Sequence, residues 1–193
     1  SLVTLARGVK PPRYPSLWEA LCNAVAFQQL SLEAAIATMR RVIAHCSTPL
    51  AFGEIQLYPF PTPAAFRETD PAMLRSLGLS ARKVQTLREA ADLLLAGRLT
   101  AAELGSLPTA KAMDRLALLR GIGPWTSAVV MLRGFGRLDV FPAGDSGARR
   151  NLRGLLGAGA DEAAEGAKIL ATLGPWRGML YYHLLLWRLS KRG

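Results

Sequence analysis

The stretch from residue 116 to residue 128, LALLRGIGPWTSA, constrains the fold of this chain more than any other feature of its sequence. It begins with the apolar spacing of a helix and continues with an apolar helical face beyond residue 128. Between them, Gly121 and Gly123 flank one aliphatic residue, which favours a turn with positive φ angles and exposed backbone N–H groups. Pro124 stands where a second helix would start, because that position tolerates its missing N–H. The stretch predicts two helices joined by a glycine turn, with amides that can bind a phosphate.

An isolated acid, Asp145, follows 22 residues after Gly123. It lies in VFPAGDSGARR, a stretch rich in proline and glycine at the head of a predicted helix. The glycine turn, the interval and the lone acid together resemble the HhH-GPD superfamily of base-excision DNA glycosylases. The sequences GIGPWT and PWR (175–177) resemble 3-methyladenine DNA glycosylase II, the AlkA type. This resemblance covers about residues 15 to 187 and implies a helix-hairpin-helix fold in two lobes, with the active-site cleft between them.

Helical periodicity recurs along the rest of the chain, and no useful length of β alternation is present, so the predicted fold class is all-α. Helices are expected over 15–30, 32–46, 80–96, 109–119, 149–156, 161–173 and 175–192, with short helices starting at Thr62-Pro63 and Asp70-Pro71. Thr100 to Glu103 forms a capping box, and 47–61 is expected to be an irregular loop. The last helix is predicted to carry one apolar stripe, made of Trp176, Met179, Leu180, His183, Leu184 and Trp187.

The chain is divided into an N-terminal arm, 1–14, and one helical domain, 15–193, that contains the hairpin at 116–128. AlkA-type enzymes usually carry a small N-terminal sheet domain before their helical part. The first 14 residues are too few to form one. The sequence therefore corresponds either to a compact member of the family or to a fragment.

The charge of the chain favours a polyanionic partner. Its net charge is +10 and its pI is near 10.4. The stretch from residue 115 to residue 153 contains seven arginines and only two acids. The excess of positive charge is therefore concentrated around the hairpin and the candidate catalytic acid. Any single arginine there can be part of a solvated helix face, but the clustering favours nucleic-acid binding for the group. No apolar run approaches the length of a membrane span, and no secretory signal is visible.

The few cysteines and histidines indicate no metal site and no cofactor. Cys22 and Cys46 are 24 residues apart and belong to no CxxC motif, so we expect two core thiols in a reducing cytosol. His45 and His183 stand without ligand partners, and His183 is expected to be a satisfied core residue. In relatives the hairpin carbonyls often hold a monovalent cation, and the resemblance assigns Leu119 and Ile122 to that role.

The resemblance assigns a second DNA-contacting element to Gln28-Gln29-Leu30, between the first two predicted helices. In such glycosylases this element enters the duplex where a base is flipped. Leu30 would be the wedge that fills the vacated space, and Gln29 would hydrogen-bond near the orphaned base. An apolar plug of this kind lowers the free energy of extrusion by preventing restacking. The sequence alone favours an ordinary core leucine at a helix end, and the resemblance favours the wedge.

One carboxylate meets the needs of the implied reaction. Cleavage of an N-glycosidic bond passes through an oxocarbenium-like state, which a carboxylate stabilises while it orients or activates water. A base such as 3-methyladenine or 7-methylguanine is already cationic and leaves without a general acid. Asp145 fits this role better than Asp139, which precedes the Phe-Pro turn. Asp145 can also be a helix N-cap, and the two roles are compatible.

Three further residues define the predicted base pocket. Bifunctional relatives carry a Schiff-base lysine at the position that Trp125 occupies, so we expect no lyase activity. Trp125 and Trp176 match aromatic pocket positions of the AlkA type, where an indole face holds a cationic base. Either tryptophan could instead be a core residue on an apolar helix stripe. Val129 stands where the family often has a tyrosine. The smaller valine would widen the pocket, which would then also admit 1-methyladenine or 3-methylcytosine.

The sequence thus predicts a monofunctional alkylbase DNA glycosylase that works without a cofactor on double-stranded DNA. Its predicted DNA-binding residues are Gln29, Leu30, Gly121, Ile122, Gly123, Thr126 and Arg149. We expect a monomer in the cytoplasm, associated with the nucleoid and with no membrane partner. The alternative is a non-catalytic DNA-binding module that uses the hairpin as a phosphate clamp. A mismatch or oxidised-base glycosylase is a third, weaker reading, since Trp125 replaces the lysine and cluster cysteines are missing.

Overall fold

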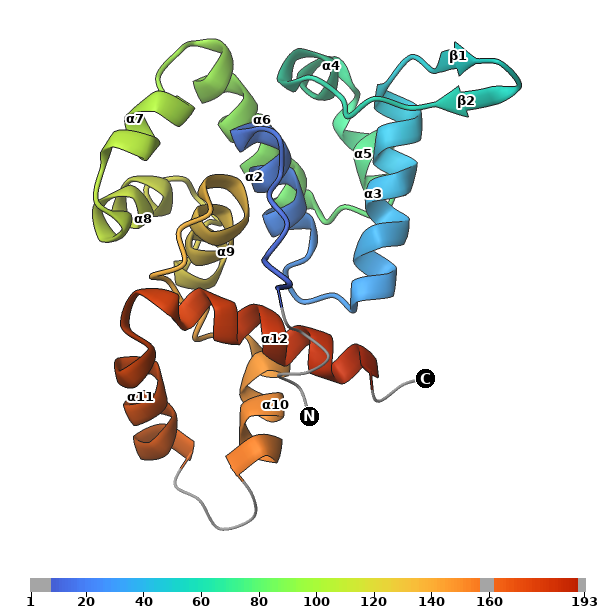
Figure 1. Cartoon of the computed structure of the whole chain (residues 1–193). Coiled ribbons are helices and arrows are strands. Elements are labelled where there is room, and N and C mark those ends of the chain that lie inside the picture. Colours follow the sequence, from blue (N-terminus) through green and yellow to red (C-terminus); the bar gives the residue numbers. More distant parts are fainter. Residues whose placement is uncertain (1–7, 157–161, 191–193) are drawn as a thin grey trace.

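Helices make up most of the part of the chain that the computed structural model describes, residues 8–156 and 162–190 (Figure 1). The predicted all-α fold class is confirmed. The helices are α2 (Leu17–Ala26), α3 (Leu32–Cys46), α4 (Pro63–Glu68), α5 (Pro71–Ser76), α6 (Ala81–Leu95), α7 (Ala101–Ser106), α8 (Thr109–Ala117), α9 (Pro124–Phe135), α10 (Ser146–Leu156), α11 (Glu162–Leu173), the 3₁₀ helix η1 (Gly174–Trp176) and α12 (Arg177–Ser190). None of the described helices is long and apolar enough to cross a membrane.

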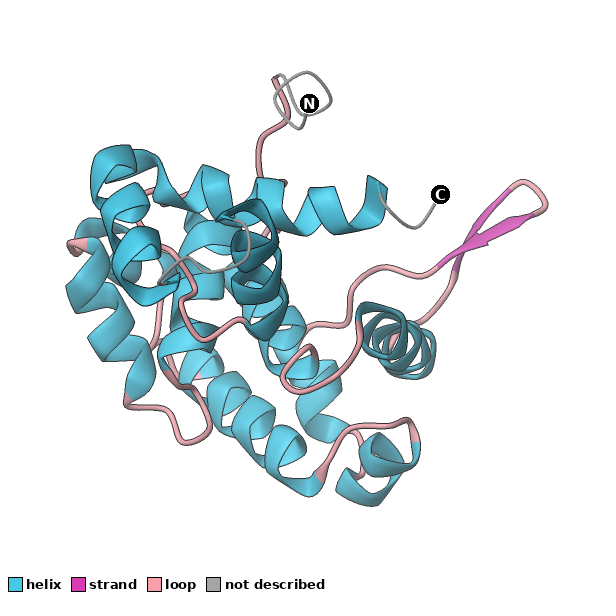
Figure 2. Cartoon of the chain, turned by 90° about the horizontal axis from the view of Figure 1, so that it is seen from below, coloured by secondary structure: helices cyan, strands magenta, loops and turns pink. Residues whose placement is uncertain are grey.

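One predicted loop is in fact a β-hairpin. The strands β1 (Leu50–Phe52) and β2 (Ile55–Leu57) pair antiparallel within 47–61 and extend away from the helices (Figure 2). Gly53 sits in the connecting turn with φ of 60°, a conformation that glycine adopts without strain. Three residues per strand are too few to produce a recognisable alternation, which explains why the sequence pattern failed to predict them.

Polar side chains cap the helix starts much as the sequence predicted. Ser31, Thr62 and Asp70 each accept a hydrogen bond from a backbone N–H in the first turn of the following helix. Thr100 caps α7 in the same way, through the N–H of Glu103 at 3.0 Å. The second half of that capping box is replaced, because the carboxylate of Glu103 pairs with Arg115 at 2.7 Å.

Several predicted helix boundaries are displaced, and two of the displacements affect candidate site residues. The first helix ends at Ala26, and residues 27–30 form a turn in which Gln29 has φ of 56°. At the other end of the chain, α12 begins only after the short helix η1. Trp176 therefore does not belong to the apolar stripe of α12, and 59% of its surface is exposed. Among the side chains of α12 whose burial is described, those of Tyr181 and Leu184 are buried, and only Leu184 belongs to the predicted stripe.

The core of the molecule surrounds α2, which packs against α6 and α9 (Figure 1). Almost every side chain of α2 is buried, from Leu17 to Ala26. The close approach to α9 depends on Gly134, where an added Cβ would lie 2.9 Å from the Cβ of Ala20. Trp18 completes the packing by donating its indole N–H to the carbonyl of Pro61 at 2.8 Å.

A second group of helices, α10 to α12, packs below the first (Figure 1). Asn151 of α10 donates to the carbonyl of Leu184 in α12 at 2.7 Å. The start of α12 is tied to the segment before Asp145, because the N–H of Gly178 donates to the carbonyl of Leu138 at 2.7 Å. The implied two-lobed arrangement thus consists of α2–α9 and α10–α12.

The predicted N-terminal arm, 1–14, is described from residue 8 onward, and residues 1–7 lie outside the described part. The N–H of Tyr14 donates to the carbonyl of Arg133 at the end of α9. Nε2 of His183 lies 3.2 Å from the carbonyl oxygen of Val9. The described part of the arm therefore runs along α9 and α12, and His183 has the hydrogen-bond partner expected of it.

Candidate active site and DNA-contacting turns

The glycine turn between α8 and α9 has one glycine that the fold requires and one that leaves space open. Gly121 has φ of 91°, and an added Cβ would lie 2.2 Å from Oγ1 of Thr86. Gly123 is different, because its φ is −100° and an added Cβ would meet nothing within 4 Å. Only Gly121 has the positive φ that the sequence suggested for this turn.

The second helix of the hairpin starts without a side-chain cap. Pro124 occupies the first position of α9, and Gly123 is its N-cap residue with no side chain to offer. The first amides of a helix have no carbonyl partner within the helix, so those of Trp125 and Thr126 remain available for an external acceptor. Together with the open space beside Gly123, they form a seat suited to a phosphate group.

Side chains from α6 and from the turn after α2 fix the path of the hairpin backbone. Thr86 donates its hydroxyl to the carbonyl of Arg120 at 2.8 Å. The amide of Gln28 donates to the carbonyl of Gly121 at 2.9 Å and to the hydroxyl oxygen of Thr126 at 2.8 Å. Thr126 is buried, and its hydroxyl is engaged by this contact. Ile122, between the two glycines, is also buried.

The turn 27–30 presents Gln29 and Leu30 outward beside the hairpin. Both side chains are exposed, Leu30 to 40%. Lys83 fixes this turn from α6 by donating its amino group to the carbonyls of Ala26 and Gln28, at 2.9 and 2.8 Å. Burial lowers the pKa of the Lys83 amino group. The exposure of Leu30 excludes the alternative that it is an ordinary core leucine.

Asp145 is the point at which α9, α10 and α12 meet. Its Oδ1 accepts the N–H of Ala148 at 2.8 Å, so the residue is the N-cap of α10. Its Oδ2 accepts the indole N–H of Trp125 at 3.1 Å and the hydroxyl of Tyr181 at 2.8 Å. Asp145 as a whole is half-buried. It thus combines the N-cap role with a carboxylate that three hydrogen bonds fix in a partly accessible place.

Tyr181 is a site residue that the sequence analysis missed. It is 5% exposed, and its ring packs edge-on against Phe141 with centroids 5.8 Å apart. Burial, and then the neighbouring charge of Asp145, raise the pKa of its hydroxyl well above the ordinary value for tyrosine. The available signal was a tyrosine among the apolar residues of the last helix, because a buried hydroxyl there needs a partner.

The three predicted base-pocket residues are placed differently. Trp125 is half-buried beside Asp145, and Val129 follows one turn later on α9, packed against the core. Trp176 lies two residues before Gly178, which binds the chain segment that leads to Asp145. Its large exposure excludes a core role for Trp176 and leaves its indole accessible to a ligand.

The arginines between 115 and 153 fall into two groups. Arg115 pairs with Glu103, Arg133 donates to the carbonyl of Pro12, and Arg137 donates to the carbonyl of Gly105. These three hold the fold together. The other four side chains are exposed on the hairpin and on α10: Arg120, Arg149, Arg150 and Arg153. The exposed basic surface therefore contains fewer arginines of this stretch than the sequence count suggested.

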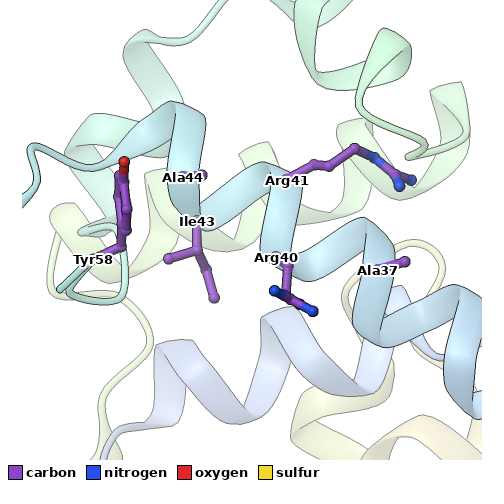
Figure 3. A pocket seen from close by; sticks show the side chains of 6 residues that line it. All are labelled: Ala37, Arg40, Arg41, Ile43, Ala44 and Tyr58. Carbon is purple, nitrogen blue, oxygen red and sulfur yellow. The ribbon is translucent and has the colours of Figure 1, made fainter. Parts of the chain in front are cut away.

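A separate hollow lies along α3, beside Tyr58 of the segment that follows β2 (Figure 3). Its lining residues are Ala37, Arg40, Arg41, Ile43, Ala44 and Tyr58. None of them belongs to α9, α10 or α12, so this hollow is not part of the Asp145 site. Among the described residues, no group of three or more His, Cys, Asp or Glu side chains is arranged to hold a metal ion.

Comparison with known proteins agrees with this geometry. The model of the family described as HhH-GPD superfamily base excision DNA repair protein matches residues 22–175. DNA-3-methyladenine glycosylase 1 of Schizosaccharomyces pombe is 34% identical over 137 residues, which cover 70% of this chain and 56% of that protein. The chain thus spans little more than half the length of this relative.

Two solved structures share the fold over almost the whole chain. One is the 3-methyladenine DNA glycosylase of S. pombe in complex with abasic DNA, with a TM-score of 0.76 and 30% identity, covering 98% of this chain and 89% of that one. The other is the 3-methyladenine DNA glycosylase from Archaeoglobus fulgidus, with a TM-score of 0.80 and 25% identity, covering 95% of this chain and 63% of that one. The chain belongs to the HhH-GPD superfamily of base excision DNA repair proteins.

Proposed function

We propose that this protein is a monofunctional DNA glycosylase that removes alkylated bases from double-stranded DNA, acting as a monomer. The observation that carries the proposal is the carboxylate of Asp145, which three donors hold at the head of α10, beside an indole and close to exposed arginines. The named relatives are 3-methyladenine glycosylases, which supports an alkylated base as the substrate.

In the proposed reaction, Asp145 stabilises positive charge on the sugar and orients the attacking water. The bond between C1′ and the base nitrogen breaks, and its electron pair goes to the cationic base, which leaves neutral. Water adds to C1′ and loses one proton to the carboxylate or to solvent. A base that is cationic before the reaction needs no general acid, so one carboxylate is sufficient.

The proposed DNA contacts come from the two turns that Gln28 ties together. Gly121, Ile122, Gly123 and Thr126 would bind a phosphate through backbone groups, and the carbonyls of Leu119 and Ile122 would hold a monovalent cation there. Gln29 and Leu30 would enter the duplex where the base is extruded. Arg149 on α10 would bind a further phosphate.

The proposed base selectivity rests on Trp125, Trp176 and Val129. The exposed indole of Trp176 suits stacking on a cationic base, because the indole face is electron-rich. Val129 adds little volume and no polar group one turn from Trp125. We therefore propose a pocket that admits 1-methyladenine and 3-methylcytosine besides 3-methyladenine and 7-methylguanine.

The proposal excludes strand cleavage. Trp125 occupies the position that carries the Schiff-base lysine in bifunctional relatives, and an indole cannot form an imine with the sugar. Treatment with borohydride during turnover should therefore trap no covalent protein–DNA adduct. A trapped adduct would show that another amine acts as nucleophile and would contradict the monofunctional assignment.

The direct test is base release from duplex DNA methylated with dimethyl sulfate, followed by chromatography of the freed bases. We expect free 3-methyladenine and 7-methylguanine, with the strand intact until it is heated in alkali. Duplexes with a single 1-methyladenine or 3-methylcytosine test the wider pocket. Tight binding without release from any of these duplexes would favour the alternative, a non-catalytic DNA-binding module.

A further inference from the structure

We infer that Tyr181 is a positioning residue that fixes the carboxylate of Asp145 in the orientation used for catalysis. The inference rests on the proposed glycosylase function. It concerns a residue of α12 that lies 36 positions after Asp145 and reaches it through one hydrogen bond, from its hydroxyl to Oδ2 at 2.8 Å.

The hydrogen bonds to Asp145 leave little freedom to its carboxylate. A carboxylate has about four positions at which it accepts hydrogen bonds, two on each oxygen. Tyr181 and Trp125 fill both positions of Oδ2, and the N–H of Ala148 fills one position of Oδ1. Among the contacts of the described residues, the remaining position is therefore on Oδ1. That position is where a water or the sugar can approach.

The hydroxyl of Tyr181 is suited to act as a permanent donor. Its side chain is buried, and the pKa of the hydroxyl is raised by that burial and by the adjacent carboxylate. The hydroxyl thus keeps its proton at neutral pH and can donate it to Oδ2. Trp125 has an indole N–H, which donates only. Both groups on Oδ2 are therefore donors to the carboxylate.

The placement of this hydroxyl is determined by α12 and its contacts. Gly178 binds the carbonyl of Leu138, three residues before Tyr181, and Leu184 accepts a hydrogen bond from Asn151 three residues after it. Between these two anchors, the ring of Tyr181 packs against Phe141. Phe141 lies in the same segment as Asp145. These contacts fix the ring, so the hydroxyl can be removed without removing the packing.

Tyr181→Phe is accordingly a selective test, since it keeps the ring and deletes one donor. We expect the maximal single-turnover rate of 7-methylguanine release to fall about tenfold, because small misplacements of a catalytic group have effects of this order or larger. The Kd for a duplex with a tetrahydrofuran abasic-site analogue should stay within about twofold, because that donor does not bind DNA. Tm should change by no more than a few degrees.

Tyr182→Phe is the matched control, since it removes a hydroxyl from the next residue of the same helix. Its rate and Kd should both stay within about twofold of wild type. A Tyr181→Phe protein that releases 7-methylguanine at the wild-type rate would overturn the inference while leaving the proposed function intact. A parallel loss of rate and of duplex affinity would overturn it in favour of a general structural role. A wild-type protein that releases no base would overturn the proposed function and this inference together.

Discussion

The hydrogen bonds that fix the hairpin differ in kind from those that fix the Asp145 site. At the hairpin, polar side chains bind backbone carbonyls: Thr86 binds Arg120, Gln28 binds Gly121, and Lys83 binds the end of α2. At the second site, donors from three helices converge on one side chain, that of Asp145.

The difference shows what each region has to fix. Side chains that bind carbonyls set the path of the backbone, which leaves the amides at the start of α9 directed outward. Donors that converge on one carboxylate set the orientation of one functional group. Variants of the hairpin supports should therefore act on the stability and shape of the fold. Variants of the donors around Asp145 should act on the rate.

The largest effect on stability is expected at Gly121. Its φ of 91° is strained for alanine, and the new Cβ would clash with Oγ1 of Thr86. Gly121→Ala should lower the free energy of unfolding by about 3 kcal/mol in urea denaturation. The control is Gly123→Ala, whose Cβ meets open space at φ of −100° and should leave stability nearly unchanged. Equal losses in the two variants would mean that the two glycines do not differ as described.

A smaller loss is expected when the link between the hairpin and the turn 27–30 is cut. Gln28→Ala removes both hydrogen bonds to the hairpin and should lower the free energy of unfolding by about 1 to 2 kcal/mol. Affinity for an abasic-analogue duplex should fall as well, because the turns lose their mutual placement. Gln29→Ala, the exposed neighbour, should leave the free energy of unfolding within about 0.5 kcal/mol of wild type. If both variants unfold alike, the link is not structural.

Lys83 should mainly affect how the free energy of unfolding changes with pH. Burial lowers its pKa in the folded protein below the value of 10.5 that is expected when it is unfolded. Between these two values the unfolded state binds more protons, so this residue makes stability rise with pH until about 10.5. Lys83→Met should flatten that rise, with an effect of about 1 kcal/mol or less at neutral pH. Denaturation from pH 7 to pH 10.5 measures it, with exposed Lys111→Met as control. Identical slopes for wild type and Lys83→Met would contradict the argument.

The smallest effect on stability is expected at Leu30. Its side chain is 40% exposed, so Leu30→Ala should change the free energy of unfolding by no more than about 0.5 kcal/mol. Base release from duplex DNA should nevertheless slow severalfold, because extrusion loses its apolar plug. Measuring both quantities separates a wedge from a core residue. A normal release rate together with a large loss of stability would contradict the wedge role.

The same contrast explains which parts the sequence could predict. Local sequence signals predicted the hairpin and most helix starts. Residues such as Gly121, Pro124 and Ser31 determine the backbone conformation of the residues next to them in the chain. The supports were missed, because Thr86 and Tyr181 act on residues 34 and 36 positions away. The periodicity of apolar residues in a sequence does not predict contacts between residues so far apart in the chain.

Exposure was the other quantity that the sequence could not supply. The sequence places Trp176 on the apolar stripe of the last helix. In the structure it belongs to η1, before α12 begins, and its indole lies at the surface. Within the cluster of arginines, only the fold separates Arg137, which binds backbone carbonyls, from the exposed Arg149.

The proposed function requires that Asp145 performs the hydrolysis. The most direct measurement is release of 7-methylguanine from methylated duplex DNA by wild type and by Asp145→Asn. The amide can still cap α10 through its oxygen, but it carries no charge to stabilise the sugar cation. We expect a rate at least about 100-fold lower for the variant, with binding to an abasic-analogue duplex retained. Release by Asp145→Asn at the wild-type rate would contradict it and would place the chemistry elsewhere in the molecule.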